Sequence, residues 1–223
     1  MKFNNYINDL SEDIRIDGLE KFFSKLFSRK NIQPKDISER FGTPYRSLMN
    51  YLEGRRSFPL KTCKEILRFL SSNNKEYKKL LDKMFETITI AKSTCSHAQP
   101  IILPKILDEK LAYLIGAMHD GCVFSNEKKN QYLIQYVQHS SEDWLHLVSR
   151  YLKYVFGIQP HVYRGYLQIS NKVVYEFFSK VIKIPQYQKD WSSFLNGIPW
   201  YLQKWMIIGM LDTDGWCGTP QDL

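Results

Sequence analysis

Two aspartates stand at equivalent points of two similar segments, each after an apolar stretch and directly before a glycine. Asp120 belongs to LAYLIGAMHDG, and Asp214 belongs to WMIIGMLDTDG, 94 residues further along the chain (214 minus 120). Glycine often follows a helix end, so a single copy would indicate only a cap. Two carboxylates brought close together repel each other, and a divalent cation between them offsets that repulsion. Oxygen ligands suit Mg²⁺, which activates water for phosphodiester hydrolysis, so the repeat predicts a Mg²⁺-dependent hydrolytic site.

Small residues in both segments indicate how the two aspartates could meet. Gly116, Ala117 and Gly209 would let two helix backbones approach closely, which brings the C-terminal ends of the helices together. The negative ends of the two helices would add to the attraction for a cation. We therefore expect Asp120 and Asp214 to converge beside a helix pair.

The segment GMLDTDG at 209–215 resembles the GLIDADG motif of the LAGLIDADG homing endonucleases, position by position. The order of elements between the aspartates is similar to one repeat of that family. The resemblance implies a half-saddle of four strands in the major groove of double-stranded DNA, with Asp120 and Asp214 as catalytic, metal-binding residues. It also implies polar or basic side chains from strand ends around the metal, for which Gln138 and Lys172 are the candidates.

The elements that must position these residues follow from periodicity and capping, and they indicate an α+β fold. The sequence predicts a helix capped by Asp108, strands in CVF and QYLIQYVQ, and a helix that starts at a capping box of Ser140 and Asp143. Gly157 should end that helix, because glycine favours the position after a helix C-terminus. A strand pair in HVYRGYLQIS, a helix in VVYEFFSKVIKI and a second apolar helix after Pro199 follow.

Alternation along the last of these strands predicts which side chains face DNA. Leu167 and Ile169 should face the core, whereas Tyr166, Gln168 and Ser170 should face outward toward DNA. Along QYLIQYVQ the alternation is too poor to choose a face.

A second DNA-binding feature precedes this region. In DISERFGTPYRSLMNYLEGRR, Gly42 stands at a turn, Thr43 at the N-cap and Pro44 at the first position of a second helix. The segment from 37 to 59 resembles the Cro/repressor-type helix-turn-helix family. A helical hairpin that only packs on a neighbour is the alternative. The DNA-binding candidates, with types that suit base edges or phosphates, are Thr43, Tyr45, Arg46, Ser47, Asn50, Arg55 and Arg56.

The charge is concentrated in the front of the chain. The net charge is +8, of which residues 1–90 carry +6 (18 basic minus 12 acidic) and residues 91–223 carry +2 (13 minus 11). A polyanionic partner suits this excess, and a solvated basic face explains it equally well. We expect an all-helical DNA-binding domain at 1–90, a linker at 91–104 and an endonuclease-like domain at 105–223.

Two departures from the family pattern bear on activity. Gly116 precedes Asp120 by four positions, whereas Gly209 precedes Asp214 by five, which predicts a relative rotation of roughly 100°. Residues 216–223 also leave no room for four further strands. Three explanations are open. The gene is truncated, a homodimer partner supplies the missing C-terminal half, or the front domain takes over the binding of DNA.

Three functions therefore stay open. The first is a metal-dependent, site-specific DNA endonuclease, the second is a DNA-binding regulator or a remnant without cleavage, and the third is a structural protein whose Asp-Gly pairs only cap helices. The opening residues contain no secretory signal and the chain has no long uncharged apolar run, so we expect a cytoplasmic protein without a membrane partner. Four scattered cysteines argue against a zinc site.

Overall fold

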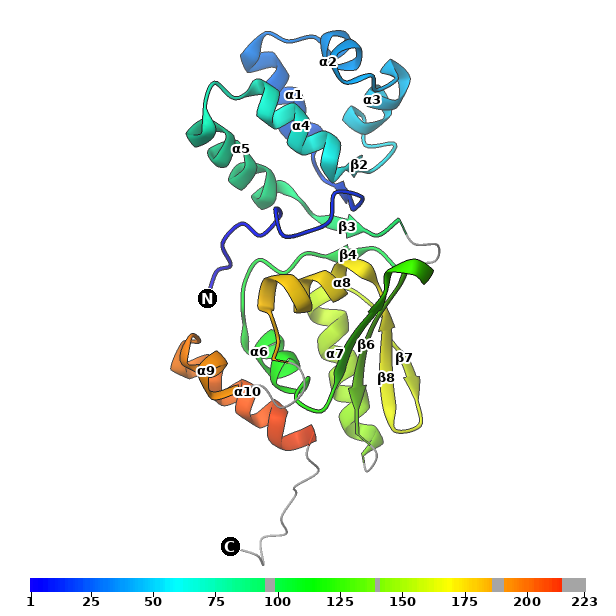
Figure 1. Ribbon diagram of the computed structural model, residues 1–223, viewed down its shortest axis with the longest axis vertical. Helices are drawn as coiled ribbons and strands as arrows, with labels where there is room; N and C mark the ends of the chain where they lie inside the picture. The colour runs from blue at the N-terminus through cyan, green and yellow to red at the C-terminus, as the bar shows by residue number, and fades with distance from the viewer. Residues whose placement is uncertain (95–98, 139–140, 186–190, 214–223) are drawn as a thin grey trace, which may run out of the picture. The chain divides into compact units, whose positions relative to one another are not determined.

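The computed structural model describes residues 1–94, 99–138, 141–185 and 191–213, and it divides into two compact units (Figure 1). One unit comprises residues 5–94, and the other comprises residues 1–4 together with 95–223. The first four residues belong to the C-terminal unit because Met1 exchanges two backbone hydrogen bonds with Leu107, of 2.7 and 2.9 Å. The chain therefore passes between the units twice, after residue 4 and after residue 94.

The unit of residues 5–94 contains five helices and three short strands that form an antiparallel sheet in the order β2-β1-β3. The expectation of an all-helical front domain was wrong. Strands of two or three residues are too short to show the alternation by which a sequence reveals them, and β3 overlaps the start of the segment expected to be a linker. The elements are β1 (Arg15–Asp17), α1 (Glu20–Lys30), α2 (Pro34–Phe41), α3 (Tyr45–Leu52), β2 (Phe58–Pro59), α4 (Leu60–Leu70), α5 (Asn74–Thr87) and β3 (Ile90–Lys92).

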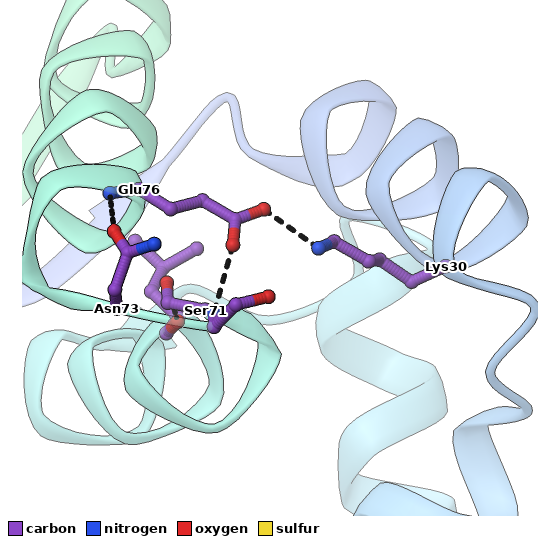
Figure 2. A network of polar contacts seen from close by, with 6 residues as sticks. Lys30, Ser71, Asn73 and Glu76 are labelled. Carbon is purple, nitrogen blue, oxygen red and sulfur yellow. Dashed lines mark hydrogen bonds and ion pairs between the residues drawn. The ribbon is translucent and has the colours of Figure 1, made fainter.

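A polar network joins the end of α1 to the start of α5 (Figure 2). Lys30 Nζ lies 2.6 Å from Glu76 Oε1, and the other carboxylate oxygen of Glu76 accepts a hydrogen bond from the Ser72 amide at 2.7 Å. The side chain of Asn73 caps α5 by accepting from the Glu76 amide at 2.9 Å. The hydrogen bond from Lys30 and those from Ser72 lower the pKa of Glu76 to about 2.

The C-terminal unit is built on a four-stranded antiparallel sheet in the order β5-β6-β8-β7 (Figure 1). Helix, strand pair, helix, strand pair and helix follow one another as the sequence predicts. The described elements are β4 (Ile101–Ile102), α6 (Glu109–Gly116), β5 (Cys122–Asn126), the 3₁₀ turn η1 (Glu127–Lys129), β6 (Gln131–Val137), α7 (Glu142–Phe156), β7 (His161–Tyr163), β8 (Tyr166–Ser170), α8 (Lys172–Glu176), the π-helical turn η2 (Phe177–Ile182), α9 (Trp191–Asn196) and α10 (Trp200–Thr213).

The helix ends confirm two of the predicted capping residues, at the start of α6 and at the end of α7. Asp108 accepts a hydrogen bond from the Leu111 amide at 2.9 Å, which confirms the predicted cap of α6. Gly157 ends α7 with a left-handed backbone, φ 68°, also as predicted. The N-cap of α7 is Ser141, whose hydroxyl accepts from the Trp144 amide, and the expected cap Ser140 lies outside the described residues.

One face of the sheet is buried and the other is largely open. Leu167 and Ile169 are buried, whereas Tyr166 and Gln168 are half-buried and Ser170 is exposed, which confirms the alternation predicted for β8. Within the described ranges, no helix is both long enough and apolar enough to cross a membrane.

Candidate functional site

Helices α6 and α10 pack against each other at two glycines. A Cβ atom added at Gly116 would collide with the backbone carbonyl of Met206, and one added at Gly209 would collide with the carbonyl of Tyr113. The two contacts are reciprocal, because Met206 precedes Gly209 by three residues and Tyr113 precedes Gly116 by three. The expected close approach of the two apolar helices is confirmed, and it has an approximate two-fold symmetry at the glycines.

α6 is followed by a turn that is tighter than an α-helix. The amides of Met118 and His119 bond to the carbonyls three residues earlier, at 3.1 and 2.9 Å, which is the 3₁₀ pattern. The relative rotation of roughly 100° expected from the two glycine spacings stays a prediction, because Asp214 lies outside the described residues.

Asp120 lies at the exit of this turn, where its carboxylate is accessible. Its side chain is 42% exposed, and its Oδ1 lies 3.2 Å from Nδ1 of His119. The next residue, Gly121, has no room for a side chain, because an added Cβ would lie 2.5 Å from the carbonyl oxygen of Gln135 on β6. This contact places Asp120 beside the C-terminal end of β6.

The last turn of α10 reaches the same region. Asp212 accepts a hydrogen bond from the Tyr113 hydroxyl at 2.6 Å, and the buried side chain of Gln138 donates from Nε2 to the carbonyls of Asp212 and Thr213 at 2.9 and 3.2 Å. Burial, together with the bond to Asp212, raises the pKa of Tyr113 well above its usual range. Asp214, the second predicted catalytic and metal-binding residue, lies outside the described residues.

Gln138 directly follows β6, and its side chain binds the end of α10. Lys172 is not brought to this region. It starts α8, and its ammonium lies 5.2 Å from the ring centre of Tyr132. Tyr132 and Gln138 are six residues apart along β6, a distance of about 20 Å in a strand. The placement of Lys172 argues against a role beside Asp120.

The outer face of the sheet carries polar side chains across three strands. Gln135 of β6 is opposite Gln168 of β8, and its Nε2 donates to Oε1 of Gln168 at 3.0 Å. Tyr163 and Tyr166 stack with their ring centres 4.7 Å apart. The sequence did not identify Gln135, because β6 shows no clear alternation; its register with β8 assigns it to the face of Gln168.

In the other unit, α2 and α3 are two short helices joined by a turn at Gly42, as the sequence predicts. Gly42 has a left-handed backbone, φ 61°, in the turn between the helices, and Leu48 is fully buried. The expected N-cap, Thr43, is wrong: Pro44 occupies that position, and its carbonyl accepts the first helical hydrogen bonds from Ser47 and Leu48. Thr43 instead accepts a hydrogen bond from Ser38 through its carbonyl.

The side chains expected to contact DNA lie at the accessible end of α3 and in the segment after it. Tyr45 and Arg46 are exposed, and Ser47 and Asn50 are half-buried. The backbone amides of Arg55 and Arg56 both donate to the carbonyl of Asn50, at 2.8 and 3.1 Å, and both side chains are exposed. Arg55 also pairs with Glu53 at 3.1 Å, which partly neutralises it.

The described residues alone do not complete a cation site. No group of three or more His, Cys, Asp or Glu side chains is close enough to hold a metal within them. Asp120 supplies one accessible carboxylate, whereas Asp212 is bound to Tyr113. A Mg²⁺ site at this position fits the structure only if Asp214 contributes the second carboxylate. No protein-family model matches the sequence, and no curated protein matches it either.

Proposed function

We propose that this chain is a site-specific DNA-binding protein of the LAGLIDADG homing-endonuclease type that hydrolyses DNA phosphodiesters. The observation that carries the proposal is the reciprocal packing of α6 on α10 at Gly116 and Gly209, which brings the end of α10 to the region where Asp120 is accessible. A helix pair in contact through its backbones is what the repeated motif predicts.

The two units offer separate contacts for double-stranded DNA. The exposed Tyr45 and Arg46 at the start of α3 suit the edges of bases, and Arg55 and Arg56 suit phosphates. The outer face of the sheet adds Gln168, whose amide suits adenine. Neutralisation of phosphates by the basic residues makes this binding strongly dependent on salt.

Asp120 and Asp214 are the residues that would hold Mg²⁺, which would supply an activated water and stabilise the leaving oxygen. The chain's own contribution is geometric. The glycine contacts fix the helix pair, a tight turn leads from α6 to Asp120, and the hydrogen bonds of Tyr113 and Gln138 hold the end of α10.

A DNA-binding regulator without cleavage is the second candidate, and one observation favours it. In the region of Asp120, the carboxylate of Asp212 accepts from Tyr113, and that of Asp120 itself lies 3.2 Å from Nδ1 of His119, so both described carboxylates have contacts within the protein. A helix-turn-helix binds DNA without any such site.

The experiment that tests the proposal combines DNA binding with nicking. The chain is incubated with a plasmid library that carries its own flanking genomic sequence, with Mg²⁺ or with EDTA. We expect Mg²⁺-dependent nicking that Asp120→Asn abolishes without weakening DNA binding. Asp143→Asn, which changes an exposed carboxylate on α7, is the matched control and should nick normally. Salt-sensitive binding without nicking would support the regulator, and the absence of salt-sensitive binding would contradict both functions.

A further inference from the structure

We propose that Tyr113 and Gln138 are positioning residues that fix the last turn of α10 relative to Asp120. This inference rests on the proposed function and adds to it: the two side chains do not react, but they determine where the chain leaves α10. Neither is assigned this role by the motif, which places Gln138 beside the metal and says nothing of Tyr113.

The first contact is a hydrogen bond across the helix pair. The Tyr113 hydroxyl donates to Oδ2 of Asp212 over 2.6 Å, between residues that are 99 positions apart in sequence. Tyr113 is also the residue whose carbonyl lies against Gly209, and its ring packs edge-on against Tyr151 at 5.3 Å. The same residue therefore sets both the closeness of the helices and the position of Asp212.

The second contact comes from the sheet. The last four carbonyls of a helix have no partner within the helix, and buried ones must be satisfied by other donors. Gln138, whose side chain is buried, supplies one such donor to the carbonyls of Asp212 and Thr213. Its own backbone amide donates to Gly165 at 3.0 Å, so the cap is tied to the turn between β7 and β8.

These contacts restrain α10 from two directions at the residues directly before Asp214. Tyr113 acts from α6 on the side chain of Asp212, and Gln138 acts from the sheet on the backbone. A rigid support of this kind is what a reactive group needs, because small displacements of a reacting atom lower the rate strongly. Loss of either contact should therefore loosen the end of α10 and slow hydrolysis while DNA binding is unchanged.

The test uses the full chain with Tyr113→Phe and Gln138→Met, which retain most of the side-chain volume but remove the donors. Amide hydrogen exchange of residues 209–213 should accelerate about fivefold in each variant, as expected for the loss of one hydrogen bond. The nicking rate should fall with the affinity for DNA unaltered. Tyr175→Phe is the matched control: it removes a hydroxyl that donates to Ser125 at 3.1 Å, and it should change neither quantity.

Unchanged exchange at 209–213 in both variants would overturn the positioning role. Faster exchange throughout the unit, and not only at 209–213, would also overturn it, because the residues would then only support the fold. If the wild-type chain does not nick DNA, the proposed function fails, and the exchange experiment still decides whether the two contacts hold α10. A double variant, Tyr113→Phe with Asp212→Ala, should lose less than the sum of the two single changes, because both remove the same bond.

Discussion

Gly116 and Gly209 occupy reciprocal positions on two helices, each lying against the carbonyl three residues before the other. No residue with a side chain fits at either place, because the atom that it would meet belongs to the backbone and cannot move aside alone. The close approach of α6 and α10, and with it the placement of Asp120, therefore requires glycine, which has no side chain, at both positions.

Substitution of Gly116 or Gly209 by alanine should destabilise the C-terminal unit. The added methyl group would push the helices apart, and overpacking of this kind costs about 1–3 kcal/mol, occasionally more. The free energy of unfolding in urea measures the effect. Gly197→Ala is the control, because a Cβ there would lie 3.6 Å from the nearest backbone atom in ordinary contact. Equal stability of all three variants would show that the helices are not in backbone contact.

Acid should weaken the unit of residues 5–94 through Glu76. The pKa of this carboxyl falls from 4.5 to about 2 on folding, so its ionised form stabilises the folded state. The contribution is complete above pH 4.5 and is lost as the pH falls toward 2. Glu76→Gln should therefore flatten the dependence of stability on pH between these values. Glu39→Gln removes an exposed carboxylate that lies 3.8 Å from Lys35, and it should leave the dependence as it is.

DNA recognition should depend on Arg46 at the start of α3. Arg46→Ala should weaken specific binding by about 1–3 kcal/mol if the side chain contacts a base, and it should relax the preference for one base pair. A titration by fluorescence anisotropy at several salt concentrations measures both the affinity and the salt slope. Arg29→Ala changes an exposed arginine on α1 and should affect the affinity only through charge. An identical effect of the two variants would exclude base readout by Arg46.

Substitution of Lys172 should leave the activity unchanged. Its ammonium lies over Tyr132, at the end of β6 away from Gln138, so Lys172→Met should not change the rate of nicking. A variant that binds DNA normally but nicks slowly would show that the basic residue of the site is Lys172 and that the sheet packs differently. Single-turnover kinetics separate the rate of nicking from the affinity for DNA.

The sequence predicted the elements of the C-terminal unit because their signals are local. Asp108 and Gly157 mark helix ends by their own side chains or backbone, and Leu167 and Ile169 alternate with polar neighbours. The three strands of the front unit were not predicted, because they are only two or three residues long.

The contacts within the site could not be predicted in the same way. The bond from Tyr113 to Asp212 joins residues 99 positions apart, and nothing in either segment indicates the partner. The tight turn that leads from α6 to Asp120 depends on two backbone hydrogen bonds, which residue types alone do not specify. The position of Gln138 after a strand makes it a candidate for the site. Its role as a cap of α10 follows only from the packing of α10 beside the end of β6.

The most direct test of a metal site at the paired helix ends is a calorimetric titration of Mg²⁺ into the full chain and three variants. Asp120→Asn and Asp214→Asn should each lower the affinity for Mg²⁺ by about tenfold or more, as the loss of a ligand predicts, whereas Asp143→Asn should bind like the unchanged chain. Equal affinities in all four proteins, or no heat of binding in any of them, would contradict the account.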